Sequence, residues 1–214
     1  MGNKVHARGF RIGVIRGWDG VWFADRKSFR HLLRDDVRIR AFLLKDLKEA
    51  QVDHVEIERS RGNLKINIFS AKPGIIIGRA GSGIEELSKK LKQEFFPGKR
   101  VNLNINVKEL QRPSLSAKVV GEQVAAEIVK RMPFRRSMKS AIERVMKAGA
   151  LGVKIVVSGR LNGADIARRE AIAHGKIPLH TLRSDIDFAN VRAETIWGTI
   201  GVKVWVNRGE VFEE

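Results

Sequence analysis

The residues best suited to hold a ligand form the sequence Gly78-Arg79-Ala80-Gly81, directly before an amphipathic helical pattern. Glycines at its two ends permit a tight turn and let another backbone approach closely, while Arg79 projects between them. The amides that open the following helix favour a negatively charged group such as a phosphate. Together with Lys72 just upstream, the loop predicts a clamp for a nucleic-acid backbone.

A second candidate site lies on a helix that we expect to begin at Phe134. Arg135, Arg136 and Lys139 occupy positions i, i+1 and i+4, so they share one flank of that helix beside its apolar stripe. Such a run is often only a solvated face, but Glu143 is the sole acidic residue between positions 130 and 147. This scarcity of acids favours a phosphate-binding ridge.

No group of residues has the spacing of an active site. The five histidines are scattered without metal-ligand spacing, and no nucleophile elbow or Ser-His-Asp arrangement occurs. Asp185 and Asp187 would share one face of a strand, and we interpret them as surface acids rather than a carboxylate pair. The order Gly78-x-x-Gly81-x-Gly83 reverses a dinucleotide fingerprint, and the Lys-Ser or Lys-Thr of a P-loop is missing. We therefore expect no enzymatic activity, cofactor or metal.

The charge of the chain indicates a polyanionic partner. Its 214 residues include 41 Lys and Arg against 24 Asp and Glu, a formal net charge of +17. Nucleic acid is the commonest partner of such a surface. Hydrophobic residues make up 43%, too many for a disordered chain, yet no apolar run approaches the ~20 residues of a membrane span. The N-terminus lacks the apolar core of a signal peptide, and the absence of cysteine excludes disulfides and thiolate sites, which agrees with a reducing cytoplasm.

The first half of the chain predicts helices on one face of a three-stranded sheet. Ser28 would cap a short helix and Asp36 a longer one. We interpret Trp18, Trp22 and Phe23 as caps of the core, with base stacking as the alternative. The remaining elements are two hairpin strands at 55–58 and 64–68, a helix at 84–95 and a strand at 101–107.

The second half predicts an independent α+β domain of two helices and about four strands. We expect helices at 117–128 and 134–146, a strand at 153–157, a short helix at 164–170 that carries Arg168 and Arg169, and extended segments at 177–182, 186–197 and 202–206. The resulting domain organisation is a basic N-terminal arm at 1–16, a first domain at 17–108, a second at 109–207 and an acidic tail at 208–214.

The stretch Ile76-Ile77-Gly78-Arg79-Ala80-Gly81-Ser82-Gly83-Ile84 resembles the signature of a KH domain, whose Gly-x-x-Gly loop clamps the backbone of single-stranded RNA. The helix-first order resembles the type II arrangement.

Nearly the whole chain resembles the family of the bacterial-type small-subunit ribosomal protein three, the universal KH-domain ribosomal protein of the small-subunit head. The matching motifs are Lys4-Val5-His6, Gly9-Phe10-Arg11-Ile12-Gly13, Lys72-Pro73-Gly74-Ile75-Ile76-Ile77-Gly78, Phe134-Arg135-Arg136-Ser137-Met138-Lys139, Val157-Ser158-Gly159-Arg160-Leu161 with Gly163-Ala164, Pro178-Leu179-His180-Thr181-Leu182-Arg183 and Ile200-Gly201-Val202-Lys203-Val204-Trp205.

The resemblance implies a protein that binds small-subunit rRNA in the head and lines the channel where mRNA enters. Its neighbours would be ribosomal proteins ten and fourteen, with four and five across the channel, and it would not form a homo-oligomer. By motif match, Arg135, Arg136 and Lys139 would help to open mRNA duplexes without nucleotide hydrolysis. Contacts with rRNA would fall on Lys4, His6, Arg8, Arg11, Arg160, Arg168, Arg169 and Arg183. Whether the KH loop binds rRNA or mRNA stays open.

Two positions depart from the family pattern. The family commonly has proline where this chain has Ala7, and an aromatic pair where it has Ala171-Ile172, so a contact at each place is in doubt. A free KH-domain regulator or a ribosome assembly factor is the alternative function, although the carboxy-terminal motifs argue against it. The expected location is the ribosome of the cytoplasm, with an organellar ribosome as the alternative.

Overall fold

The computed structural model describes residues 4–60, 62–98 and 101–212. The chain divides into two compact units, one formed by residues 18–111 and the other by residues 1–17 together with 112–214. The N-terminal arm therefore does not stand alone, because it belongs to the same unit as the second half of the chain. In the described part of the chain, no helix is long and apolar enough to cross a membrane.

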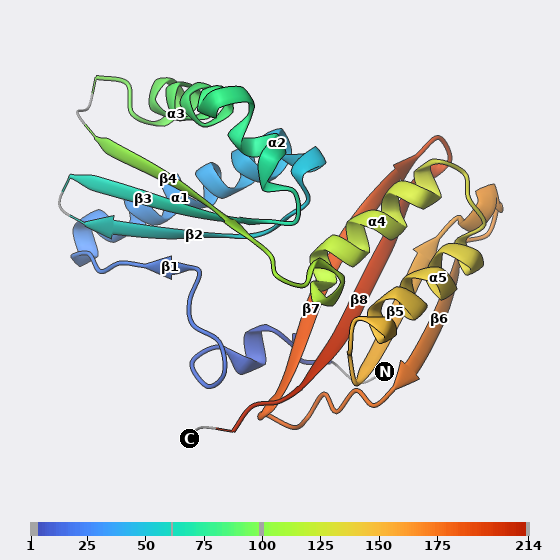
Figure 1. The fold of residues 1–214 in the computed structure, drawn as a ribbon. Coiled ribbons are helices and arrows are strands. Elements are labelled where there is room, and N and C mark those ends of the chain that lie inside the picture. The colour runs from blue at the N-terminus through green and yellow to red at the C-terminus, as the bar shows by residue number, and fades with distance from the viewer. Residues whose placement is uncertain (1–3, 61, 99–100, 213–214) are drawn as a thin grey trace. The chain divides into compact units, whose positions relative to one another are not determined.

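The unit at 18–111 consists of helices and a sheet of four strands in the order β1-β2-β3-β4 (Figure 1). Strands β2 and β3 form the expected antiparallel hairpin, and β4 joins β3 in parallel. The short β1 adds a parallel edge that the sequence pattern did not predict. The elements are β1 (Gly20–Val21), α1 (Arg26–Asp46), η2 (Lys48–Ala50), β2 (Val52–Ser60), β3 (Asn63–Ser70), α2 (Pro73–Ile77), η3 (Arg79–Gly81), α3 (Ser82–Phe95) and β4 (Asn102–Glu109).

One hydrophobic core holds this unit together. Ile39 and Leu43 of α1 and Leu91 of α3 pack against the sheet residues Ile57 and Ile66, all with at most 1% of their surface exposed. Burial of each such side chain contributes about 1.5–3 kcal/mol. The alternation of apolar residues along β2, β3 and β4 is confirmed, because these strands turn the predicted face toward the helices.

The prediction of two helices near the start of this unit is wrong. A single helix of 21 residues, α1, spans both predicted segments, and its N-cap is Asp25 instead of Ser28. Asp36 lies buried in its middle because both carboxylate oxygens have donors: Arg59 Nε lies 2.7 Å from Oδ1, and Trp22 Nε1 lies 2.7 Å from Oδ2. Because both carboxylate oxygens are hydrogen-bonded, Asp36 can lie in the middle of the helix and does not need to cap its N-terminus.

The aromatic residues before α1 do not all belong to the core. Phe23 is 94% exposed and Trp18 is 68% exposed, so the interpretation of these two as core caps is wrong. Trp22 is partly buried and packs against Phe29 with ring centroids 5.3 Å apart.

In the other unit, two helices cover one face of a four-stranded antiparallel sheet with the order β6-β5-β8-β7. Figure 1 shows α4 and α5 side by side on that face. Their apolar stripes, including Val124 and Met138, share a core with Ile155 and Val204 of the sheet. The elements are η1 (Gly9–Arg11), η4 (Pro113–Leu115), α4 (Ala117–Val129), α5 (Phe134–Lys147), β5 (Gly152–Gly159), η5 (Leu161–Gly163), β6 (Arg168–Gly175), β7 (Ser184–Thr195) and β8 (Gly198–Glu210).

Three expectations for this unit are wrong. The predicted helix at 164–170 is a loop followed by β6, which pairs with the edge of β5 and packs Ile172 against the core. The segment at 177–182 forms no strand. Strand β8 continues to Glu210, so the predicted tail at 208–214 begins within the sheet; Glu213 and Glu214 lie outside the described residues.

The arm is anchored by Arg11, whose side chain is fully buried. Its guanidinium donates hydrogen bonds to the carbonyl oxygens of Ala7 (2.8 Å), Ser184 (2.6 Å) and Thr181 (2.9 Å), and more weakly to two further carbonyls in the segment before β7. Because its donors are used within the protein, the expected contact between Arg11 and rRNA is not available in this structure. Ala7 is also buried, so this position is packed in the structure although it lacks the proline that is common in the family.

Asp185 and Asp187 are structural residues, which corrects their interpretation as surface acids. Arg16 lies 2.9 Å from each carboxylate, and Arg208 lies 3.1 Å from Asp187. Asp187 also accepts a hydrogen bond from the amide of Ala117 at the start of α4. Burial alone would lower the pKa of Arg16, but the carboxylates of Asp187 and Asp185 outweigh it and raise that pKa. The cluster ties the arm, α4 and two strands together.

Candidate nucleic-acid interface

The Gly-x-x-Gly loop joins α2 to α3 and is built from left-handed backbone. Gly78, Ala80 and Gly81 have φ angles of 70°, 50° and 85°. A Cβ at Gly78 would lie 2.8 Å from the amide nitrogen of Gly83, and a Cβ at Gly83 would lie 2.5 Å from the carbonyl oxygen of Ile76. Glycine is therefore required at both positions by close backbone packing as well as by φ at the first.

The loop presents its cations to solvent. Arg79 and Lys72 are exposed, and among the described residues neither side chain has a hydrogen-bond or ion-pair partner. The three isoleucines before the loop form the short helix α2 rather than an extended run. Ile76 is buried at 2% exposure, while Ile75 and Ile77 are 51% and 38% exposed. The loop thus combines unpaired positive charge with apolar surface, as a binder of single-stranded RNA requires.

The basic ridge lies on the first turns of α5. Met138 and its neighbours in the apolar stripe are buried, which turns Arg135, Arg136 and Lys139 toward solvent. The first turn holds no acidic residue, and no side chain caps it. A helix N-terminus of this kind favours an anion, and the three cations add to that preference.

The three ridge cations are not equivalent. Arg135 Nη2 lies 2.6 Å from Glu170 Oε1 on β6, and its Nε donates to the second oxygen at 3.2 Å. The hydrogen bonds to Glu170 raise the pKa of Arg135, and those from Arg135 lower the pKa of Glu170. Among the described residues, Arg136 and Lys139 have no such partner. Two of the ridge cations are therefore unpaired within the described chain, whereas Arg135 is held by a carboxylate.

The remaining predicted RNA contacts differ in how available they are. Lys4 and Arg169 are exposed and have no hydrogen-bond or ion-pair partner among the described residues. Arg168 is also exposed, and its charge helps to lower the pKa of Glu170. Arg160 donates to the carbonyl oxygen of Ala164 and to Asp165, and Arg183 donates to Glu210. These two arginines therefore make contacts within the protein, and their positive charge is partly compensated by the carboxylates.

The arm lies over the sheet face that the helices leave open. The ring of His6 packs edge-on against Phe188, with centroids 4.8 Å apart, and Arg8 is half-buried. Lys154, Lys203 and Trp205 line the same surface, which encloses a cavity of about 310 Å³.

Within β6, Ala171 is exposed and Ile172 reaches the core. The departure from an aromatic pair therefore leaves alanine at the position that faces outward.

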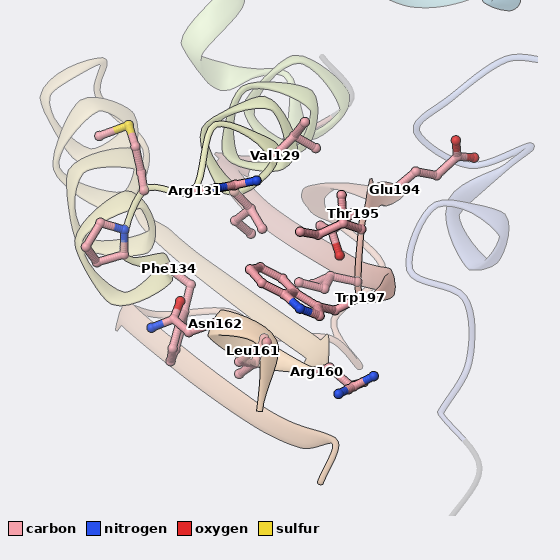
Figure 2. Close-up of a pocket in the computed structure, with 15 residues that line it drawn as sticks. Val129, Arg131, Phe134, Arg160, Leu161, Asn162, Glu194, Thr195 and Trp197 are labelled. Carbon is pink, nitrogen blue, oxygen red and sulfur yellow. The ribbon is translucent and has the colours of Figure 1, made fainter. Parts of the chain in front are cut away.

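Sequence reasoning missed two relationships at this interface. Glu170 was assigned no role, because nothing in the spacing of the residues connects it with Arg135. Trp197 and Arg131 were likewise overlooked, although they face one another across a cavity beside the ridge (Figure 2). Nothing in the spacing of these two residues connects them, because they lie in turns far apart in the chain.

Comparison with known proteins matches both units. A model of the KH domain matches residues 38–115, and a model of the C-terminal domain of ribosomal protein S3 matches residues 124–206. A single chain with a KH loop, a basic ridge and this second domain is an RNA-binding protein of the ribosomal class.

Relatives of full length extend the match over the whole chain. The proteins named small ribosomal subunit protein uS3 of Pediococcus pentosaceus and Enterococcus faecalis are each 50% identical to it, over 214 and 211 residues. These alignments span 100% and 99% of this chain and 94% of each relative. The uS3 of Syntrophomonas wolfei is 48% identical over 214 residues, 100% of this chain and 92% of that protein. The chain belongs to the ribosomal protein uS3 family.

Proposed function

We propose that this protein is a structural constituent of the small ribosomal subunit in the cytoplasm and binds the rRNA of the subunit head. The net charge of +17, the unpaired cations of the KH loop and the full-length likeness to uS3 proteins support this role. Electrostatic contacts with phosphates supply most of the affinity of such a surface, and they weaken as salt rises. Lys4, Arg168 and Arg169 are the strongest candidates for rRNA contacts outside the loop, because all three are exposed and none donates a hydrogen bond to another described residue.

The ridge on α5 has a second task in this proposal, which is to help open mRNA duplexes where mRNA enters the subunit. Arg136 and Lys139 grip phosphates of one strand at a helix end that carries no acid, while movement of the ribosome along the message supplies the work. No nucleotide hydrolysis is needed. The observation that carries the proposal is the exposure of two unpaired cations one helical turn apart on a helix whose apolar face is buried in the core.

The test replaces Arg135, Arg136 and Lys139 with Ala and measures elongation through an mRNA hairpin placed at the entrance of the channel. We expect slower passage through the hairpin and normal passage through unstructured mRNA. Lys147→Ala is the matched control, because Lys147 is an exposed cation near the other end of the same helix. Equal hairpin rates for the triple variant and the parent would refute the duplex-opening role.

The proposed neighbours are ribosomal proteins ten and fourteen, with four and five across the channel. Crosslinking of intact subunits followed by peptide mapping tests these contacts. A sucrose gradient separates the ribosomal role from that of a free KH-domain regulator, since we expect the protein in the small-subunit fraction. Sedimentation only as free protein would overturn the ribosomal role.

A further inference from the structure

A cavity of about 380 Å³ lies at the edge of the second unit, beside the ridge. Its walls are the turn between α4 and α5, the loop after β5 and the turn between β7 and β8 (Figure 2). Ile128, Leu161 and Ile200 form a buried apolar floor, each with at most 8% of its surface exposed. This volume falls within the range of about 300–1,000 Å³ that ligand sites occupy.

The indole of Trp197 stands in this cavity, and it is 42% exposed. It packs closely on Gly163, where a Cβ would lie 3.0 Å from two ring atoms. The guanidinium carbon of Arg131 lies 5.9 Å from the ring centroid. Figure 2 shows Arg131 on one side of the indole and Leu161 with its loop on the other.

The spacing between Arg131 and Trp197 suits a flat group between them. A planar ring that contacts both would need two van der Waals separations, about 7 Å in all. A displacement of roughly 1 Å by the exposed arginine side chain therefore opens a slot one aromatic ring thick. Nucleobases stack on both tryptophan rings and guanidinium planes.

The backbone on two sides of the cavity adopts a constrained conformation. Arg131 and Asn162 have φ angles of 62° and 54°, two of the non-glycine residues with left-handed backbone among those described. Such a conformation is costly for a large side chain and persists where surrounding contacts impose it. The amide of Arg131 donates to the carbonyl oxygen of Ile128, and that of Met132 donates to the carbonyl oxygen of Glu127.

The charge around the cavity favours a nucleotide over a peptide. Arg131 and Arg160 contribute two cations to the lining against the single acid Glu194, although Arg160 also pairs with Asp165 at 3.1 Å outside the lining. An adjoining cavity of about 280 Å³ shares Phe134 and Leu161 with the first. Arg135 and Arg168 line it together with one acid, Glu170, which pairs with Arg135. A strand with its base in the first cavity can therefore place its phosphates along the second, toward the ridge.

We propose that this cavity binds an unpaired base of single-stranded RNA, stacked between Trp197 and Arg131. The proposal rests on the RNA-binding role of the chain and deepens it, since a captured base keeps a newly separated strand from pairing again. The ligand class is a nucleotide within a strand, because the phosphate contacts lie outside the pocket that holds the base.

The experiment compares two labelled oligonucleotides of equal length and charge, one of ordinary single-stranded RNA and one with abasic positions. Binding to the full-length protein is measured by fluorescence anisotropy at fixed salt. We expect Trp197→Ala to weaken binding of the ordinary RNA by roughly 5- to 100-fold and to leave the abasic strand unaffected. Trp197→Phe retains most of the affinity. Phe212→Ala, which removes another exposed aromatic ring beneath an arginine, is the matched control.

Arg131→Lys provides a second variant that preserves charge and removes only the guanidinium plane. It should likewise weaken binding of the ordinary RNA alone. If either variant changed the affinity for the ordinary and the abasic RNA to the same extent, the proposal would be overturned. The RNA-binding role of the ridge would still stand in that case if the variant of Arg135, Arg136 and Lys139 lost affinity. Loss of a neighbouring ribosomal protein from subunits carrying Trp197→Ala, with unchanged RNA binding, would instead identify a protein-docking site and also overturn the proposal.

Discussion

Arg135 of α5 and Glu170 of β6 are joined by an ion pair of 2.6 Å between Nη2 and Oε1. The carboxylate accepts hydrogen bonds from both Nη2 and Nε of the guanidinium. Arg135 is 69% exposed and Glu170 is 27% exposed at the side chain, so the pair is open to solvent. In the proposed function, a phosphate at the ridge would compete with Glu170 for Arg135.

Replacement of Glu170 with Gln should strengthen binding of single-stranded RNA by up to about fivefold, because a surface ion pair is weak and its removal frees one cation. Fluorescence anisotropy over a series of salt concentrations measures the change, and the salt dependence should become steeper. Glu127→Gln is the control, since Glu127 pairs with Arg144 at 3.1 Å on another face. A weaker complex with Glu170→Gln would show that the carboxylate orients Arg135 for RNA.

The titration of Glu170 should report the same ion pair. Hydrogen bonds from Arg135 lower the pKa of Glu170 in the folded protein. The pair is therefore intact above the ordinary glutamate value of about 4.3 and is lost as the pH falls through the lowered folded value. We expect the midpoint of the Glu170 carboxyl signal in an NMR titration to rise when Arg135 is replaced with Ala. An unchanged midpoint would mean that the pair does not persist in solution.

Replacement of Arg11 with Ala should destabilise the unit that contains residues 112–214 by at least about 3 kcal/mol, because several buried carbonyls lose a charged donor. Arg11→Lys should also destabilise it, since an ammonium group cannot span carbonyls on both sides as the guanidinium fork does. Urea denaturation gives the free energy of unfolding, and hydrogen exchange in β7 locates the change. Lys4→Ala should change stability little, because Lys4 is an exposed arm residue without a hydrogen-bond or ion-pair partner among the described residues. Equal stability of Arg11→Ala and Lys4→Ala would contradict the anchoring role.

Two glycine variants separate the strain of the KH loop from its packing. Gly81→Ala meets no atom within 4 Å, yet φ is 85°, so a cost of about 1–2 kcal/mol is expected. Gly83→Ala places its Cβ 2.5 Å from the carbonyl oxygen of Ile76 and should cost about 1–3 kcal/mol through displacement of backbone. Thermal unfolding measures both changes. The Gly83 variant should lose more RNA affinity, because it moves the end of α2 against α3.

Local patterns predicted much of the fold. The apolar spacing of α3, α4 and α5 and the alternation along β2 to β5 required no knowledge of distant residues, because each element must turn one face to a core. Where two local signals competed, long-range contacts decided. Asp36 has the chemistry of a helix cap, but Arg59 on β2 and Trp22 satisfy its carboxylate inside α1. The segment from Ala164 to Glu170 has helical composition, yet its last residues pair with the edge of β5 and form the start of β6.

The candidate site divides in the same way. The sequence by itself determined the Gly-x-x-Gly loop and the cationic run on α5, because each depends only on residues close together in the chain. It also determined the net charge, which depends only on composition. Only the tertiary structure decided that Arg11 is an internal anchor, that Glu170 holds Arg135, and that Arg131 faces Trp197. Each of these relationships joins side chains from elements far apart in the chain, and hydrogen bonds and ring contacts form only where folding has already placed the two partners within a few ångströms.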